Sequence, residues 1–259
     1  MKITWFGTAS LLIESGQDRI LLDPFLPLKG ADNHPSLADY AKEDAILITH
    51  GHIDHLGSIP RILEEADATV YCSSLPASTL EKRGVDSDQI AVISPGNPLL
   101  FGQMKVTPLP GKHIRFDAGL IRHTLINPLI LRYFGNFLWL LFRNPFYPEG
   151  KETLAFQIDA EDKRILVLGS LNLKENTEYP QNVDVLILPY QGASDLMTPA
   201  LAILDKIRPK AVILDHFDNA FPPISRRVDT HALKKALAEH YPDLPVIRPT
   251  AGKPVTLKS

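Results

Sequence analysis

Four side chains that commonly bind metals crowd into six positions of this sequence. His50, His52, Asp54 and His55 occupy the stretch THGHIDHLGS, which directly follows the apolar run AILI. Imidazole nitrogens and carboxylate oxygens suit zinc and related divalent ions, and ligands so close in sequence must lie on a tight loop for their side chains to converge. A chance polar loop is the competing interpretation. The density of the cluster and its position after an apolar run favour a metal site.

Further candidate ligands lie elsewhere in the chain. His113 follows a Pro-Gly-Lys turn that is suited to presenting a side chain, and His216 ends the apolar run VILD. His123 lies in an apolar segment and competes with His113, with a place in a substrate pocket or a structural role as its alternatives. Asp23 ends the run RILL before a proline, where it could be a turn former.

The apolar patterns around these residues predict alternating strands and helices. Alternating or continuous apolar runs predict strands at 2–6, 10–14, 19–23, 45–49, 69–72, 90–93, 103–109, 153–159, 164–168, 184–188 and 211–214. Helical spacing predicts helices at 58–66, with Ser58 as N-cap, at 198–207, with Thr198 as N-cap, and at 229–240. This order predicts a layered α/β fold with polar residues gathered at the ends of neighbouring strands.

The composition narrows the class of protein. The 259 residues, of which 44% are hydrophobic, can form one large domain or two small ones with a sizeable core. A net charge of −3 gives no support for a nucleic-acid partner. Cys72 is the single cysteine, which excludes an intrachain disulfide and fits a reducing compartment. Because the first residues resemble a strand and not a secretory signal, we expect a cytoplasmic protein.

One segment departs from the α/β pattern. Residues 114–152 include LINPLILRYFGNFLWLLFRNPFYPEG, the stretch richest in large apolar side chains. Polar residues, glycine and proline interrupt it, so it is too short for the ~20 apolar residues that span a bilayer. If 129–143 is helical, Arg132, Asn136 and Arg143 fall in a narrow stripe and the remaining circumference is apolar. Such a helix should be covered by another surface, either of this chain or of a partner.

The sequence resembles the metallo-β-lactamase-fold hydrolases along nearly its whole length. The resemblance rests on ITWFGTASLLIESGQDRILLDPFL, on the motif THGHIDHLGS and on VTPLPGKH. The later stretches YQGASDLMTPALAILDKIRPKAVILDHFDN and PTAGKPVTL are similar to the branch that includes ascorbate-6-phosphate lactonase and N-acylphosphatidylethanolamine phospholipase D. The resemblance implies a single domain over 1–259, a four-layer αββα sandwich with metals at one rim, and an apolar insertion at about 114–152.

The resemblance also implies two metal sites. By position, the ligands would be His50, His52 and His113 for one ion, and Asp54, His55 and His216 for the other. Zinc is the expected ion, one or two per chain, with manganese or iron as alternatives. Asp23 gains a second interpretation, as an acid that supports the metal ligands.

Ser170 is a departure from the family pattern. The family carries a metal-bridging aspartate in a Gly-Asp-Thr-like turn, whereas this chain has LVLGSLN. Loss of that carboxylate raises the net charge of a two-ion cluster from about +1 to about +2, which is unfavourable in a partly dehydrated site. We therefore expect either one tightly held ion beside a weak second site, or a pair that an anionic substrate completes.

The ligand set predicts a metal-dependent hydrolase. A metal held by three imidazoles lowers the pKa of a bound water to ~7 and polarises an ester, lactone or phosphoryl oxygen. Asp54 would bind the second metal or accept a proton from the attacking water, and Tyr190 could help stabilise the developing negative charge. The expected substrates are phosphoesters, phosphodiesters, lactones or related esters. The alternative is a non-hydrolytic metal- or ligand-binding protein altered at Ser170, and an iron-based redox role is a third.

The apolar insertion bears on the substrate and on partners. Its ends should emerge near the metal rim, between the positions of His113 and Ser170, so it could form a lid or a wall of the cleft. An apolar lid favours a substrate with an acyl or other lipid-like part. Residues 120–148 could instead make a peripheral membrane contact, with Arg132 and Arg143 near lipid phosphates, or form a homodimer contact or an internal cap.

Overall fold

The first six strands of the chain and the last described strand build one mixed sheet in the computed structural model, which describes residues 1–115 and 127–257. In spatial order its strands are β14 (Pro254–Thr256), β1 (Lys2–Gly7), β2 (Ser10–Ser15), β3 (Asp18–Leu22), β4 (Ala45–Leu47), β5 (Thr69–Cys72) and β6 (Ile90–Val92). The strands from β14 to β3 are antiparallel, and those from β3 to β6 are parallel. Thr8 and Gly16, both with positive φ, lie in the tight turns of the N-terminal meander.

The second sheet has the same number of strands and faces the first. In spatial order its strands are β13 (Val246–Ile247), β12 (Val212–Asp215), β11 (Val185–Pro189), β10 (Lys163–Val167), β9 (Leu154–Ala160), β8 (Met104–Pro110) and β7 (Leu99–Phe101). The strands β7 to β10 are antiparallel, and those from β10 to β13 are parallel. Parallel strands require crossovers, which helices supply except between β10 and β11, where residues 168–184 form a long loop.

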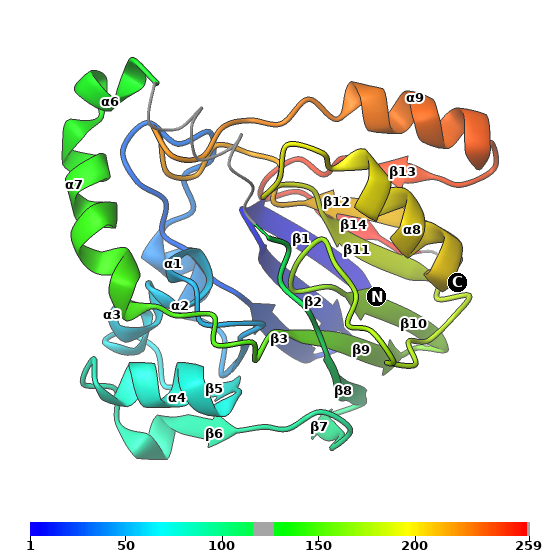
Figure 1. Cartoon of the computed structure of the whole chain (residues 1–259). Helices are drawn as coiled ribbons and strands as arrows, with labels where there is room; N and C mark the ends of the chain where they lie inside the picture. The colour runs from blue at the N-terminus through cyan, green and yellow to red at the C-terminus, as the bar shows by residue number, and fades with distance from the viewer. Residues whose placement is uncertain (116–126, 258–259) are drawn as a thin grey trace.

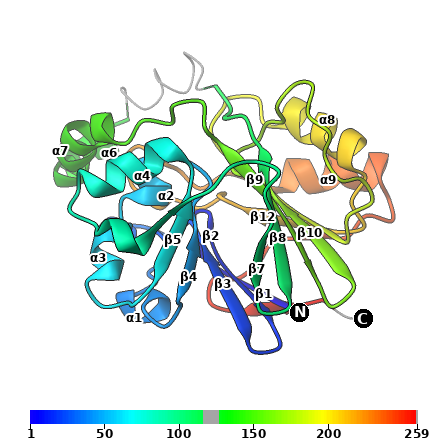
Figure 2. The ribbon, with the colours of Figure 1, turned by 90° about the horizontal axis from the view of Figure 1, so that it is seen from below.

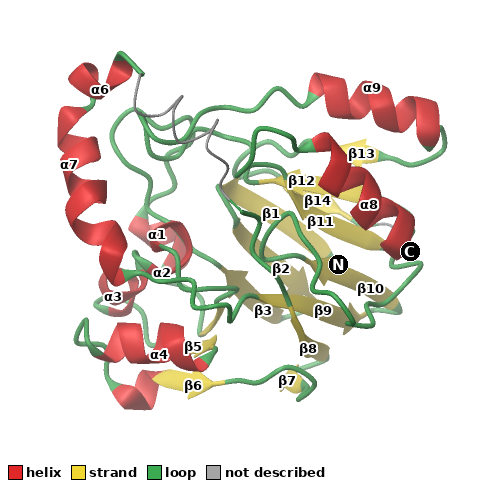
Figure 3. Ribbon diagram, in the orientation of Figure 1, coloured by secondary structure: helices red, strands yellow, loops and turns green. Residues whose placement is uncertain are grey.

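Helices cover the outer face of each sheet (Figures 1 and 2). Beside the first sheet lie α1 (Leu37–Tyr40), α2 (Ile53–Leu56), α3 (Ile59–Leu63), α4 (Ser74–Glu81), α6 (Leu129–Arg132) and α7 (Phe134–Arg143). Beside the second lie α8 (Met197–Ile207) and α9 (His231–His240), and short 3-10 turns occur at η1 (Ser87–Gln89) and η2 (Asn144–Phe146). Figure 3 shows the strands enclosed between these helices, which confirms the predicted four-layer α/β architecture.

The side-chain alternation of the strands divides the core. Leu11 and Ile13 on β2 belong to the same buried cluster as Phe156 and Ile158 on β9, and this cluster fills the space between the sheets. Leu21 on the neighbouring strand points the other way and packs in a second cluster with the helices outside the first sheet. Since side chains alternate across a strand, one sheet can bury residues on both faces in this way.

Most predicted strands are observed within two residues of their expected bounds, but the helix boundaries need corrections. Helix α8 begins at Met197 and not at Thr198, because the Asp195 carboxylate accepts the backbone N–H groups of both residues and caps the helix. Ser58 does not cap α3 with its side chain, because its hydroxyl accepts the Leu26 N–H. The strands β7, β13 and β14 and the helices α1, α2 and α4 were not predicted.

The predicted helix over 129–143 is interrupted. Tyr133 leaves helical geometry, with φ −115° and ψ 35°, so α6 and α7 are separate helices. One member of the polar stripe on this segment, Asn136, makes contacts that the sequence did not predict. Asn136 points inward and donates to the backbone carbonyls of Lys29 and Pro222, which fastens α7 to the rest of the molecule.

We predict that Phe156→Ala destabilises the fold through the core between the sheets. Phe156 is fully buried there, so its truncation should lower the free energy of unfolding by about 3–5 kcal/mol. Urea denaturation followed by circular dichroism measures this change. Leu100→Ala is the control, because Leu100 is 75% exposed and its truncation should change the free energy by less than about 0.5 kcal/mol. Equal effects of the two substitutions would contradict the assignment of the core.

Candidate metal centre

The histidine motif leaves the end of β4 on a loop that buried hydrogen bonds hold in place. Thr49 donates its backbone N–H and its hydroxyl to the Asp23 carboxylate, at 2.8 and 2.6 Å. The Thr49 carbonyl accepts the N–H of Leu154 from the second sheet, so the loop bridges both sheets. After His52 the chain forms the single helical turn of α2. This turn places His55 beside Asp54 and near the hydroxyl of Thr49, where the loop begins.

The remaining two predicted ligands arrive from the second sheet. His113 lies three residues beyond the end of β8, and Gly111 is held by its N–H bond to the Thr153 carbonyl. His216 follows β12 with φ +53°, a left-handed conformation, and its N–H donates to the Thr8 carbonyl at 2.7 Å. Strand ends of both sheets thus deliver histidines to one rim of the sandwich.

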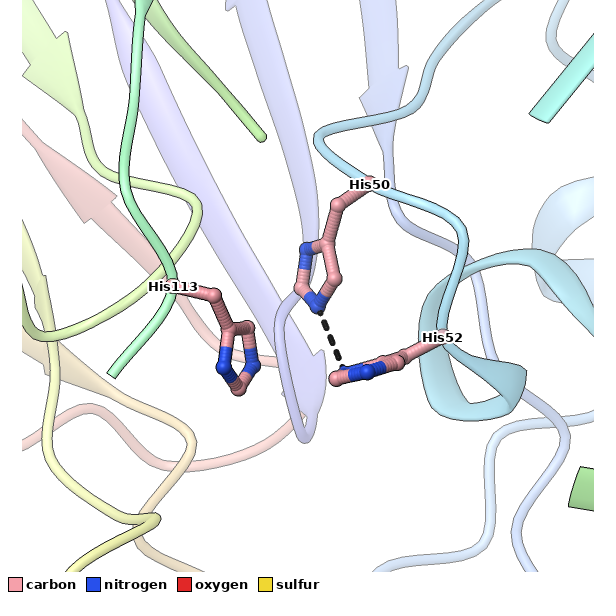
Figure 4. Close-up of side chains that lie close together, drawn as sticks. All are labelled: His50, His52 and His113. Carbon is pink, nitrogen blue, oxygen red and sulfur yellow. Dashed lines mark hydrogen bonds between the residues drawn. The ribbon is translucent and has the colours of Figure 1, made fainter. Parts of the chain in front are cut away.

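The structure brings all six predicted ligands together in two groups of three. The groups are His50, His52 and His113, and Asp54, His55 and His216, with ligand atoms of each group within 4.8 Å of one another. Figure 4 shows the rings of the first group converging from two separate loops, with His50 Nε2 and His52 Nδ1 3.1 Å apart. The rings of His50 and His55 lie 3.9 Å apart between centroids, so the two groups adjoin.

The first group has the electronic state that a transition metal requires. Burial, reinforced by the surrounding imidazoles, lowers the pKa of His50 well below its usual value. Burial likewise lowers the pKa of His52, and lowers that of His113 to about 4. The His113 Nδ1 lies 2.5 Å from the Ile114 carbonyl, which leaves Nε2 as its ligand atom. Neutral imidazoles that share a small space offer lone pairs to one cation, so these residues fit a divalent ion.

The second group contains an ionised carboxylate, and its electrostatics favour the binding of protons or of a metal cation. Burial would raise the pKa of Asp54, but the imidazoles of His55 and His216 hold it well below its usual value. Burial would lower the pKa of His55, but the carboxylates of Asp23 and Asp54 raise it to about 9. Burial would also lower the pKa of His216, but the hydrogen bond to Asp54 and the negative charges of Asp54 and Asp215 together raise it. A carboxylate buried among these rings therefore suits a bound cation.

Asp23 supports this group from behind. Its Oδ2 lies 2.8 Å from His55 Nδ1, while the same carboxylate accepts both hydrogen bonds of Thr49. Its backbone has φ +42°, so it also makes the turn that the sequence suggested. The two interpretations of Asp23 therefore both describe its place in the structure. An acceptor on Nδ1 fixes the ring and directs Nε2 toward a metal.

Ser170 lies in the turn after β10 and also borders this site. Its hydroxyl accepts the N–H of Ile114 at 3.0 Å, which ties the turn to the loop that carries His113. Gly169 precedes it where a Cβ atom would lie 2.4 Å from the Leu154 carbonyl and 2.8 Å from Thr49 Cβ, so only glycine fits. The serine thus positions a ligand loop but contributes no charge to the cluster.

A cavity of about 770 Å³ opens above both ligand groups. One wall comes from α7, through Phe137, Leu140 and Leu141, so part of the apolar insertion forms a wall of the cleft, as one of the expectations had it. Phe221 and Ile224 also line the cavity, on a loop that Asn136 joins to α7, and the sequence did not single them out because this loop has no periodicity. Tyr190 also lines the cavity, whereas His123 lies outside the described residues.

Comparison with known proteins places the chain in a family. The model of the β-lactamase superfamily domain matches residues 2–216. The chain is 30% identical to a UPF0173 metal-dependent hydrolase of Alkaliphilus metalliredigens over 229 residues, which cover 87% of this chain and 88% of that protein. It is also 30% identical to a UPF0173 metal-dependent hydrolase of Desulforamulus reducens, with 92% of each chain covered.

The chain belongs to the β-lactamase superfamily, among its metal-dependent hydrolases. A solved structure agrees on the fold. Igni18, a metallo hydrolase of Ignicoccus hospitalis, matches with a TM-score of 0.69 and 22% identity, covering 100% of this chain and 98% of that one. The superfamily predicted from the histidine motif is therefore confirmed.

We predict that Ser170→Asp increases the metal content of this superfamily member. After dialysis against a weak chelator, wild type and Ser170→Ala should retain one ion per chain, because the two-ion cluster lacks a bridging carboxylate. Ser170→Asp should retain two. Inductively coupled plasma mass spectrometry gives the ratio of metal to protein. Two ions retained by the wild type would contradict the charge argument.

We also predict that Asp23→Asn weakens metal binding at the second group. The amide keeps the size of the side chain but loses the charge that orients His55, so affinity should fall by roughly 10–100-fold. Competition with a chromophoric chelator measures it. Glu43→Gln is the control, because Glu43 is an equally buried acid that pairs with Arg19 away from the site. An unchanged affinity in Asp23→Asn would remove Asp23 from the metal centre.

Proposed function

We propose that this chain hydrolyses an ester, lactone, phosphoester or phosphodiester bond in a small molecule that carries an apolar group. The observation that carries the proposal is the position of both ligand groups at the floor of a cavity with largely apolar walls. A volume of about 770 Å³ is within the range of pockets that enclose a small organic molecule.

Zinc is the metal we propose for these groups, with manganese or iron as alternatives, because neutral imidazoles and one carboxylate suit it. The chemistry that such an ion supplies is polarisation of the scissile group and a lowered pKa of water. The six ligand residues border the cavity, so a cation that they hold would lie next to the scissile bond of a bound substrate.

Asp54 is the residue we propose for proton transfer. It lines the cavity, and its Oδ2 lies 3.1 Å from His216 Nε2 and 3.7 Å from His55 Nε2, which fixes its orientation. Its lowered pKa keeps it ionised and suits it to bind a cation, while its place in the cavity lets it accept a proton from an attacking water. Burial raises the pKa of Tyr190, whose hydroxyl therefore remains a hydrogen-bond donor for developing negative charge.

The walls of the cavity select the substrate in this proposal. Phe137 and Leu140 on α7, together with Phe221 and Ile224 on the adjacent loop, would remove an acyl or similar group from water, at about 25 cal/mol per Å² of apolar surface buried. The likeness of the C-terminal motifs to the lactonase and phospholipase branch supports the same bond types. A cytoplasmic location is part of the proposal, in keeping with the free, buried thiol of Cys72.

We predict that His52→Ala abolishes hydrolysis. With zinc added, turnover of bis-p-nitrophenyl phosphate, p-nitrophenyl esters or simple lactones should fall by roughly a hundredfold or more, because one metal ligand is lost. His240→Ala, an exposed histidine on α9, is the control and should retain full activity. Across p-nitrophenyl esters, kcat/KM should rise with acyl length. Equal rates for His52→Ala and wild type, or no turnover of any of these substrates by the metal-loaded protein, would leave a binding role only.

A further inference from the structure

The insertion gathers most of the large apolar side chains that the described surface exposes. Eight large hydrophobic residues of the described ranges are exposed, and six of them lie between 129 and 146. These six form the insertion patch, which consists of Leu129, Leu131, Phe134, Leu141, Phe142 and Phe146. Figures 1 and 2 both place α6 and α7 at the outer margin of the molecule. A concentration of this kind marks an interaction surface, whereas single exposed residues do not.

Residues on the other faces of α7 fix its orientation, so the patch stays exposed in the folded protein. Leu140 and, just beyond η2, Tyr147 belong to the buried cluster outside the first sheet. Asn136 is bonded to the carbonyls of Lys29 and Pro222. With these anchors in place, Phe134 and Phe142 remain 51% and 68% exposed. Rotation of the helix to hide them would break the anchors.

Arginines border the patch and no acid lies within its segment. Residues 127–148 contain Arg132 and Arg143 and no Asp, Glu or Lys. Arg143 lies 5.2 Å from the centre of the Trp139 ring, and Arg132 lies 5.5 Å from that of Tyr133. Arg83, from α4's C-terminal side, lies 4.7 Å from the Phe146 ring. Apolar and aromatic side chains flanked by exposed guanidinium groups are typical of helices that lie at a lipid interface.

We propose that the insertion patch docks on a membrane surface that contains anionic lipids. Lipid phosphates would complement the arginines while the apolar side chains enter the acyl boundary. A second copy of the chain fits less well, because a two-fold contact through this segment would bring arginines against arginines without an acidic partner in it. None of the described helices is long and apolar enough to cross a membrane, so the contact is peripheral.

The patch adjoins the cavity of the metal centre. Leu141 is 55% exposed as part of the patch and also lines the cavity wall. An apolar molecule could therefore pass from the lipid surface into the site along α7. This link rests on the proposed function, whereas the docking itself does not.

Co-sedimentation with vesicles tests the docking. Wild type should pellet with vesicles of phosphatidylcholine mixed with phosphatidylglycerol, and less with phosphatidylcholine alone. The triple change Phe134→Ser, Phe142→Ser and Phe146→Ser should lower partitioning at least tenfold. The pair Arg132→Gln and Arg143→Gln should lower partitioning to the anionic vesicles by about thirtyfold. Val92→Ser with Leu100→Ser, which removes the two large exposed hydrophobic residues that the described ranges hold outside the patch, should bind like wild type.

Each alternative result overturns the docking proposal. Wild type that pellets with neither vesicle type excludes a lipid partner. A concentration-dependent dimer in light scattering that the triple change dissociates, without vesicle binding, assigns the patch to a second copy. The metal-ligand variant His52→Ala should still bind anionic vesicles, so loss of catalysis and loss of docking are separable. Unchanged circular dichroism of each variant shows that it has folded.

Discussion

Burial of six imidazole and carboxylate groups at one rim is the constraint on which the rest of the structure depends. Groups of this kind are costly to remove from water unless they are paired or bind a cation. The second ligand group compensates in part through Asp54, His55 and His216, which contact one another. The first group has three imidazoles whose pKa values burial lowers, and therefore offers lone pairs without charge. Each group thus has the ligands for a divalent cation of its own, with the second bound more weakly because Ser170 supplies no bridging carboxylate.

The sandwich supplies this rim because strands of both sheets end there. The first sheet contributes Asp23 and His50, and the second contributes His113 and His216, so neither sheet alone contains a complete site. Much of this was predictable, since the apolar runs and the residues that follow them are local properties of the sequence. The convergence of His113 on His50 and His52 came from the family resemblance, because no spacing rule connects residues so distant in the chain.

What the sequence did not predict depends on tertiary contacts. Asp195 caps α8 in place of Thr198, a choice set by the loop that enters the helix. The hydrogen bonds of Asn136 to the Lys29 and Pro222 carbonyls could not be predicted, because these carbonyls belong to segments distant in the chain. The wall formed by Phe221 and Ile224 carries no periodic signal at all. In contrast, the sequence alone showed that Ser170 departs from the family pattern. The structure adds the hydrogen bond that its hydroxyl accepts from the Ile114 N–H.

Anomalous diffraction tests the central claim most directly. Crystals grown with zinc should give an anomalous difference peak on the high-energy side of the zinc edge, absent below it, among His50, His52 and His113, with a second, weaker peak among Asp54, His55 and His216. Nitrogen ligands should lie at about 2.0–2.1 Å from the first peak. Zinc at neither group, or zinc bound only to surface histidines such as His240, would contradict the account.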